Sequence, residues 1–188
     1  GDVTVRSGSS AGDNAEGGVV SVLGGDGGVG GSLSLQSGFG TSERSGSIDI
    51  VVGDNAGAGV AGGVVISAGN SFGDGSGGFV NVVGGTSTSQ LGGDVMIAGG
   101  ASSENDGGRL SLISGQSEAA STGSVNVGSA AGFFSGNTEL STGKAISSDS
   151  GTISLTTGSA VTGRTGNVVI SVGSGQVGGS VSVSAGAS

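Results

Sequence analysis

Thirteen copies of one eight-residue pattern limit what this chain can fold into. The pattern is Gly-x-h-x-h-x-x-Gly, in which h is an aliphatic residue, and successive copies start 13, 15, 16 or 17 residues apart, most often 15. The copies, called aliphatic segments below, begin at Gly1, Gly18, Gly31, Gly46, Gly62, Gly78, Gly93, Gly108, Gly123, Gly136, Gly151, Gly166 and Gly179. A repeat this short predicts an array of small equal units rather than an ordinary globular domain.

The two h positions of each segment indicate an extended backbone. They hold Val, Ile or Leu with Thr138 as the single exception in 26 positions, and the residue between them is mostly small and polar. Alternate side chains of an extended chain point to opposite faces, so the period of two predicts a short strand with one apolar face.

The rest of each repeat is built from small residues. A small residue such as Ser7 or Gly24 stands next to the closing glycine, and here we expect the chain to narrow and turn. The closing glycine, as in Gly8, is expected to supply a positive φ. Five to nine residues then link the segments, and we interpret them as the return side of a coil. Many links carry one large apolar residue, expected in the core, with an exposed loop tip as the alternative: Val29, Phe39, Val60, Phe72, Leu91, Phe133, Phe134, Ile146, Val161 and Val177.

These observations predict an all-β fold, a parallel β-solenoid shaped as a flattened β-roll or β-helix. It would have about 13 coils of about 15 residues, with like residues stacked about 4.8 Å apart. Residues 1–188 would form a single repeat array, expected to be a segment of a longer one. A β-meander is the alternative, but it would reverse direction at each link, whereas identical motifs with identical flanking glycines favour the solenoid. One coil buries too little to be stable alone, so stability would come from stacking.

Composition removes most chemistry from consideration. The chain has 47 glycines in 188 residues and no Pro, Cys, His, Trp or Tyr. Collagen is excluded because the glycines lack a three-residue period and proline is missing. Without His or Cys there is no histidine-assisted nucleophile and no zinc site built on those ligands. The 14 acidic residues are dispersed along the chain. We therefore expect no enzyme activity and predict no catalytic, cofactor-binding or metal-binding residues.

Charge also limits the partners. With 14 acidic and five basic residues the net charge is −9, which opposes binding to a phosphate backbone, so nucleic acid is not an expected partner. No stretch has the ~20 consecutive apolar residues of a membrane-spanning helix.

Two ligand hypotheses remain as further alternatives. The stretches Gly24–Gly28 and Gly73–Gly77 are superficially similar to the Gly-Gly-x-Gly-x-Asp repeats of calcium-dependent β-rolls, but the Asp positions do not recur from copy to copy. Ice-binding solenoids often carry ranks of Thr-x-Thr, and here only Thr86–Thr88 has that spacing.

The stretch Gly178 to Gly186, Gly-Gly-Ser-Val-Ser-Val-Ser-Ala-Gly, resembles repeats in long Gly/Ser-rich extracellular proteins, including cell-surface and adhesive proteins of microbes and microalgae. The resemblance is compositional and extends along the whole chain. It implies a wall, fibre or adhesive role outside the cell or on its surface. The predicted function is thus a non-catalytic structural protein that forms a stiff rod or filament by self-association. A surface adhesin or glycan-binding module, with polysaccharide or the cell surface as partner, is the alternative.

Overall fold

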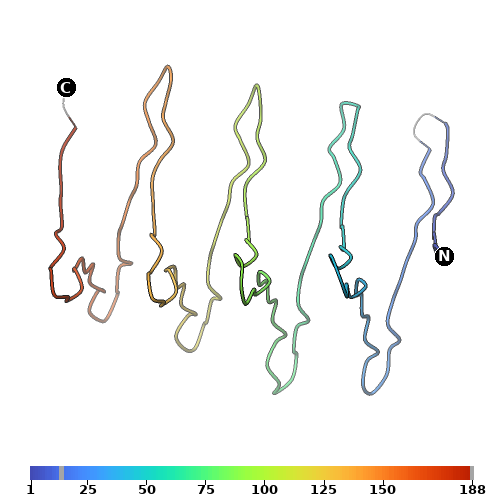
Figure 1. Cartoon of the computed structure of the whole chain (residues 1–188), viewed down its shortest axis with the longest axis horizontal. Coiled ribbons are helices and arrows are strands. Elements are labelled where there is room, and N and C mark those ends of the chain that lie inside the picture. Colours follow the sequence, from blue (N-terminus) through green and yellow to red (C-terminus); the bar gives the residue numbers. More distant parts are fainter. Residues whose placement is uncertain (13–14, 187–188) are drawn as a thin grey trace. The chain divides into compact units, whose positions relative to one another are not determined.

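The computed structural model describes residues 1–12 and 15–186, and none of these residues is in a helix or a strand. Figure 1 shows the chain as a continuous trace of extended stretches joined by loops. It divides into two units, Gly1–Val95 and Met96–Ser188. The division lies inside the aliphatic segment that begins at Gly93, so the same repeat builds both units.

Sharp bends recur once per repeat, always in the links between aliphatic segments. They lie at residues 12, 27–29, 41–43, 57–59, 73–75, 88–90, 103–105, 118–120, 132–134, 146–148, 161–163 and 176–177. The chain folds back on itself at a loop rather than advancing to a new coil, as the loop around residue 104 shows in Figure 1.

A neck closes many of these loops. We use this term for the place where the small residue and closing glycine of one segment face the opening glycine of the next. In seven necks the opening glycine donates its N–H to the closing glycine's carbonyl oxygen, at 2.8–3.0 Å. The donor and acceptor pairs are Gly18 and Gly8, Gly31 and Gly25, Gly46 and Gly38, Gly78 and Gly69, Gly93 and Gly85, Gly108 and Gly100, and Gly123 and Gly115. The small residues therefore lie where the sequence predicted a constriction.

In all but one neck, closure follows the size of the small residue. The seven closed necks have Gly, Ala or Ser at this position. Among the described residues the other five necks lack the bond, and four of these have Val52, Thr142, Thr157 or Val172. In each of these four necks a γ carbon of the β-branched residue lies beside the opening glycine. In the neck of Val52, its Cγ1 lies 2.9 Å from the position that a Cβ on Gly62 would take. The fifth open neck follows Ser129, where alanine replaces the closing glycine.

The necks need glycine for close approach and not for a left-handed backbone. At Gly84 and Gly99 an added Cβ would overlap the carbonyl oxygen of the opening glycine across the neck. The closing glycine Gly8 has nothing within 4 Å of such a Cβ, and no glycine in residues 1–12 and 15–186 has a positive φ in the left-handed range. The prediction that closing glycines such as Gly8, Gly25, Gly38, Gly53 and Gly69 supply a positive φ is wrong.

The predicted all-β solenoid is also wrong. In the residues that the structure describes there is no strand, no stacked coil and no buried side chain. The physical reason lies at the neck. In seven necks one backbone hydrogen bond joins the two sides of the loop, and the aliphatic pairs beyond it form no ladder of further bonds. The period of two identified extended residues, but it did not specify a partner for them.

Candidate interaction surface

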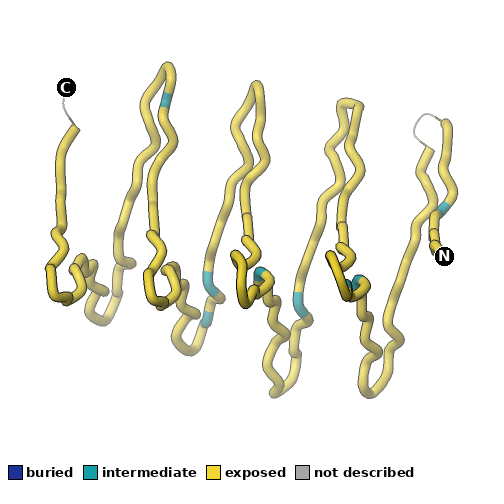
Figure 2. The backbone as a smooth tube through the Cα atoms, viewed as in Figure 1, coloured by how far each residue is buried: buried dark blue, intermediate teal, exposed yellow. Residues whose placement is uncertain are grey.

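The aliphatic segments and loop tips present the chain's apolar side chains to solvent. Figure 2 shows that almost every described residue is exposed and that none is buried. The accessible surface is 18762 Å². A compact protein of this mass exposes about 7,800 Å² and its unfolded chain about 25,000 Å², so this surface is much closer to the unfolded value.

Exposure varies in a regular way along each segment. In the copies after the first, the first aliphatic residue is about half exposed, between 46 % in Ile153 and 57 % in Val168. In these later copies, wherever both positions are aliphatic, the second residue is more exposed than the first, as in Ile170 at 71 %. The lower exposure of the first position does not depend on closure of the neck, since Val64 at 53 % follows an open neck and Val80 at 55 % a closed one.

The loop tips carry the most exposed apolar side chains. Phe39, Phe72 and Phe133 are each more than nine-tenths exposed, as are Val60 and Val161. The prediction that these residues fill a core is therefore wrong, and the alternative of exposed loop tips is correct. Phe133 and Phe134 form an edge-to-face pair, with ring centroids 5.0 Å apart and an interplanar angle of 88°.

Side-chain hydrogen bonds hold several of the bends. Ser87, Ser102 and Ser117, spaced fifteen residues apart, each accept a hydrogen bond through Oγ. The donor is the backbone N–H three residues later, at 2.9–3.0 Å. This turn is a common use of serine, and the fifteen-residue spacing of the three serines is the signal that could have predicted it.

Asn55 closes its bend from both sides. Its Nδ2 donates to the carbonyl oxygen of Gly59 at 2.6 Å, and its Oδ1 accepts from the N–H of Gly57 at 2.9 Å. The Thr86–Thr88 stretch considered for ice binding includes Ser87, whose hydroxyl accepts a hydrogen bond from the N–H of Gln90 in the bend that follows.

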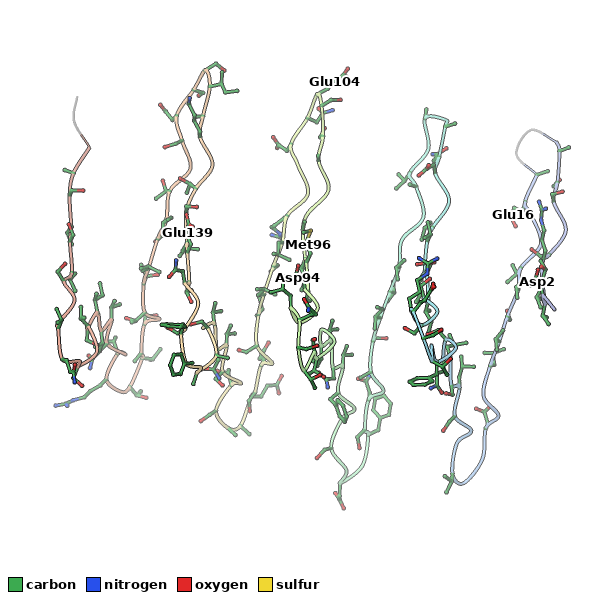
Figure 3. The ribbon with its side chains drawn as sticks, viewed as in Figure 1. Asp2, Glu16, Asp94, Met96, Glu104 and Glu139 are labelled. Carbon is green, nitrogen blue, oxygen red and sulfur yellow. The ribbon has the colours of Figure 1, made fainter. Side chains whose placement is uncertain are left out.

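The described acidic side chains form no cluster of three or more. No group of three acidic residues that could hold a metal ion occurs in residues 1–12 and 15–186. Figure 3 shows Glu104 at the tip of a loop and Glu139 along an extended segment. The described surface also has no pocket. We find no helix long and apolar enough to span a membrane in this part of the chain.

Comparisons with protein-family models, curated proteins and solved structures give no match. The case for function therefore rests on the exposed segments, the necks and the loops.

Proposed function

We propose that this chain is a non-catalytic structural protein, working outside the cell or on its surface, that acquires its apolar packing by associating with copies of itself. The observation that carries the proposal is the absence of any buried side chain in the described residues, although 33 % of the sequence is hydrophobic. Water disfavours exposed aliphatic side chains by about 25 cal/mol per Å². A chain with this much exposed apolar surface therefore has a strong drive to associate.

The repeat suits such a role. Thirteen equivalent segments provide thirteen weak contacts of the same kind, and linked contacts gain strength from their high effective concentration. Glycine and serine keep the intervening links small, which allows close approach of neighbouring chains.

Sedimentation velocity over a wide range of protein concentration tests the proposal. We expect the sedimentation coefficient to rise with concentration in physiological salt, and electron microscopy of the same samples to show elongated assemblies. A single monomeric species at every concentration would overturn the proposal.

Adhesion to a polysaccharide is a second candidate, and the exposed pair of Phe133 and Phe134 favours it. An aromatic pair at a loop tip offers a rigid apolar surface to a ligand outside the protein. Pull-down with an insoluble polysaccharide such as cellulose tests this. Retention of the wild-type chain and loss in a Phe133→Ala, Phe134→Ala variant would support adhesion, whereas equal retention of both would oppose it.

A further inference from the structure

We propose that copies of this chain bind one another through their aliphatic segments, segment against segment, while the loops stay at the periphery of the assembly. This inference rests on the proposed function and names the surface that carries it. The partner is a second copy of the same chain, and three independent observations lead to it.

The first observation is the amount of surface available. The chain exposes about 11,000 Å² more than a compact protein of the same mass. A typical stable complex needs about 800 Å² from each partner. Covering even a small share of the thirteen segments would exceed this requirement, so the segments provide far more surface than one contact with a small ligand would use.

The second observation is the state of the backbone. In the described part of the chain, the N–H and C=O groups of the aliphatic pairs make no hydrogen bond within the chain. The necks and bends use other residues for their bonds, as between Gly100 and Gly108 or Ser102 and Asn105. Extended backbone with free donors and acceptors matches another extended backbone of the same kind.

The third observation is the distribution of charge. The segments contain four acidic residues, Asp2, Asp49, Asp94 and Glu139, against two arginines, Arg6 and Arg109. The links contain the other ten acidic residues against three cations. Contact between copies through the segments therefore leaves most of the net charge of −9 in the links, where water and salt screen it. Contact through the loops would instead bring like charges together.

A pair of matched triple variants of the full chain separates the segments from the loop tips. Both replace three valines by aspartate and change the net charge equally. The segment variant carries Val20→Asp, Val80→Asp and Val168→Asp, at residues 51 %, 55 % and 57 % exposed. The loop variant carries Val29→Asp, Val60→Asp and Val161→Asp, at residues 94 %, 99 % and 99 % exposed. None of the six side chains is buried, so neither variant removes an internal core.

The readout is the protein concentration at half-association, measured by sedimentation velocity. We expect the segment variant to raise it on the order of a hundredfold, because it places charges in the contact. The loop variant should change it by less than about threefold, as expected for peripheral charges. Equal effects, or a larger effect of the loop variant, would overturn the segment surface while leaving self-association intact. A wild-type chain that never associates would overturn the proposed function itself.

Amide hydrogen exchange in the assembled wild-type protein gives a second test. Protection should appear at the aliphatic pairs on assembly, while the exchange of the bends around residues 88–90 and 118–120 stays as it is in the monomer. Protection confined to the bends would contradict the proposal.

Discussion

Replacing Gly99 by valine should open the loop between Gly100 and Gly108. Gly108 donates its N–H to the carbonyl oxygen of Gly100 at 2.8 Å, and a Cβ on Gly99 would overlap the carbonyl oxygen of Gly108. Alanine brings the same Cβ, so the neck must widen to accept it, but the bond should survive, because the neck of Ala68 is closed with Gly78 donating to Gly69 at 2.9 Å. With valine the bond should be lost, because Val52 occupies the same position in an open neck. The lost bond contributes about 1 kcal/mol.

Amide hydrogen exchange of Gly108, followed by NMR in dilute monomeric protein, measures this change. A loss of about 1 kcal/mol should accelerate exchange about fivefold in Gly99→Val. Gly99→Ala should stay within about twofold of wild type. Gly100→Val is the matched control, since a Cβ there meets nothing within 4 Å. The reasoning is refuted if Gly99→Val leaves the exchange unchanged, or if Gly99→Ala accelerates it as much as valine does.

Three further outcomes follow from the same structure. Val52→Ser should close the open neck between Gly53 and Gly62 and slow exchange of the Gly62 amide about fivefold, whereas unchanged exchange would show that residue size does not control closure. Asn55→Ala removes both hydrogen bonds of its bend and should lower the backbone order parameters around it, with Asn55→Asp intermediate because it keeps the acceptor. Raising the ionic strength from 0.01 M to 0.15 M shortens the Debye length from about 30 Å to about 8 Å. Because the chain has a net charge of −9, this screening should lower the protein concentration at which copies associate. A rise in that concentration would exclude charge repulsion as the barrier to association.

Local features of this chain were predictable from its sequence. The small residues at positions such as Ser37 and Ala68 indicated a constriction, and the structure has closed necks there. The recurrence of Gly, Ser, Asn and Asp between segments predicted turns, and bends recur in the links. These predictions succeed because they depend on residues that are close in the sequence.

The arrangement of the repeats was not predictable in the same way. A period of two at Val80 and Val82 fits an extended segment. It does so equally well whether the segment pairs with the next coil of a solenoid, with the preceding aliphatic segment or with another chain. Closure of a neck depends on small differences between side chains: one methyl group separates Ala68 from glycine, while branching separates it from Val52. Large apolar side chains such as Phe72 were expected inside because burial usually offsets their cost in water, but no internal core is present to receive them in the described residues.

The most direct test of the account is the amide hydrogen exchange of the whole chain at a concentration where it is monomeric. We predict near-intrinsic exchange throughout the aliphatic pairs. Slower exchange should appear at the opening glycines of the seven closed necks and at the bend amides that donate to side-chain oxygens. Strong protection of the aliphatic pairs in the monomer would show that they pair and pack within one chain, and it would contradict the claim that their partner is another copy.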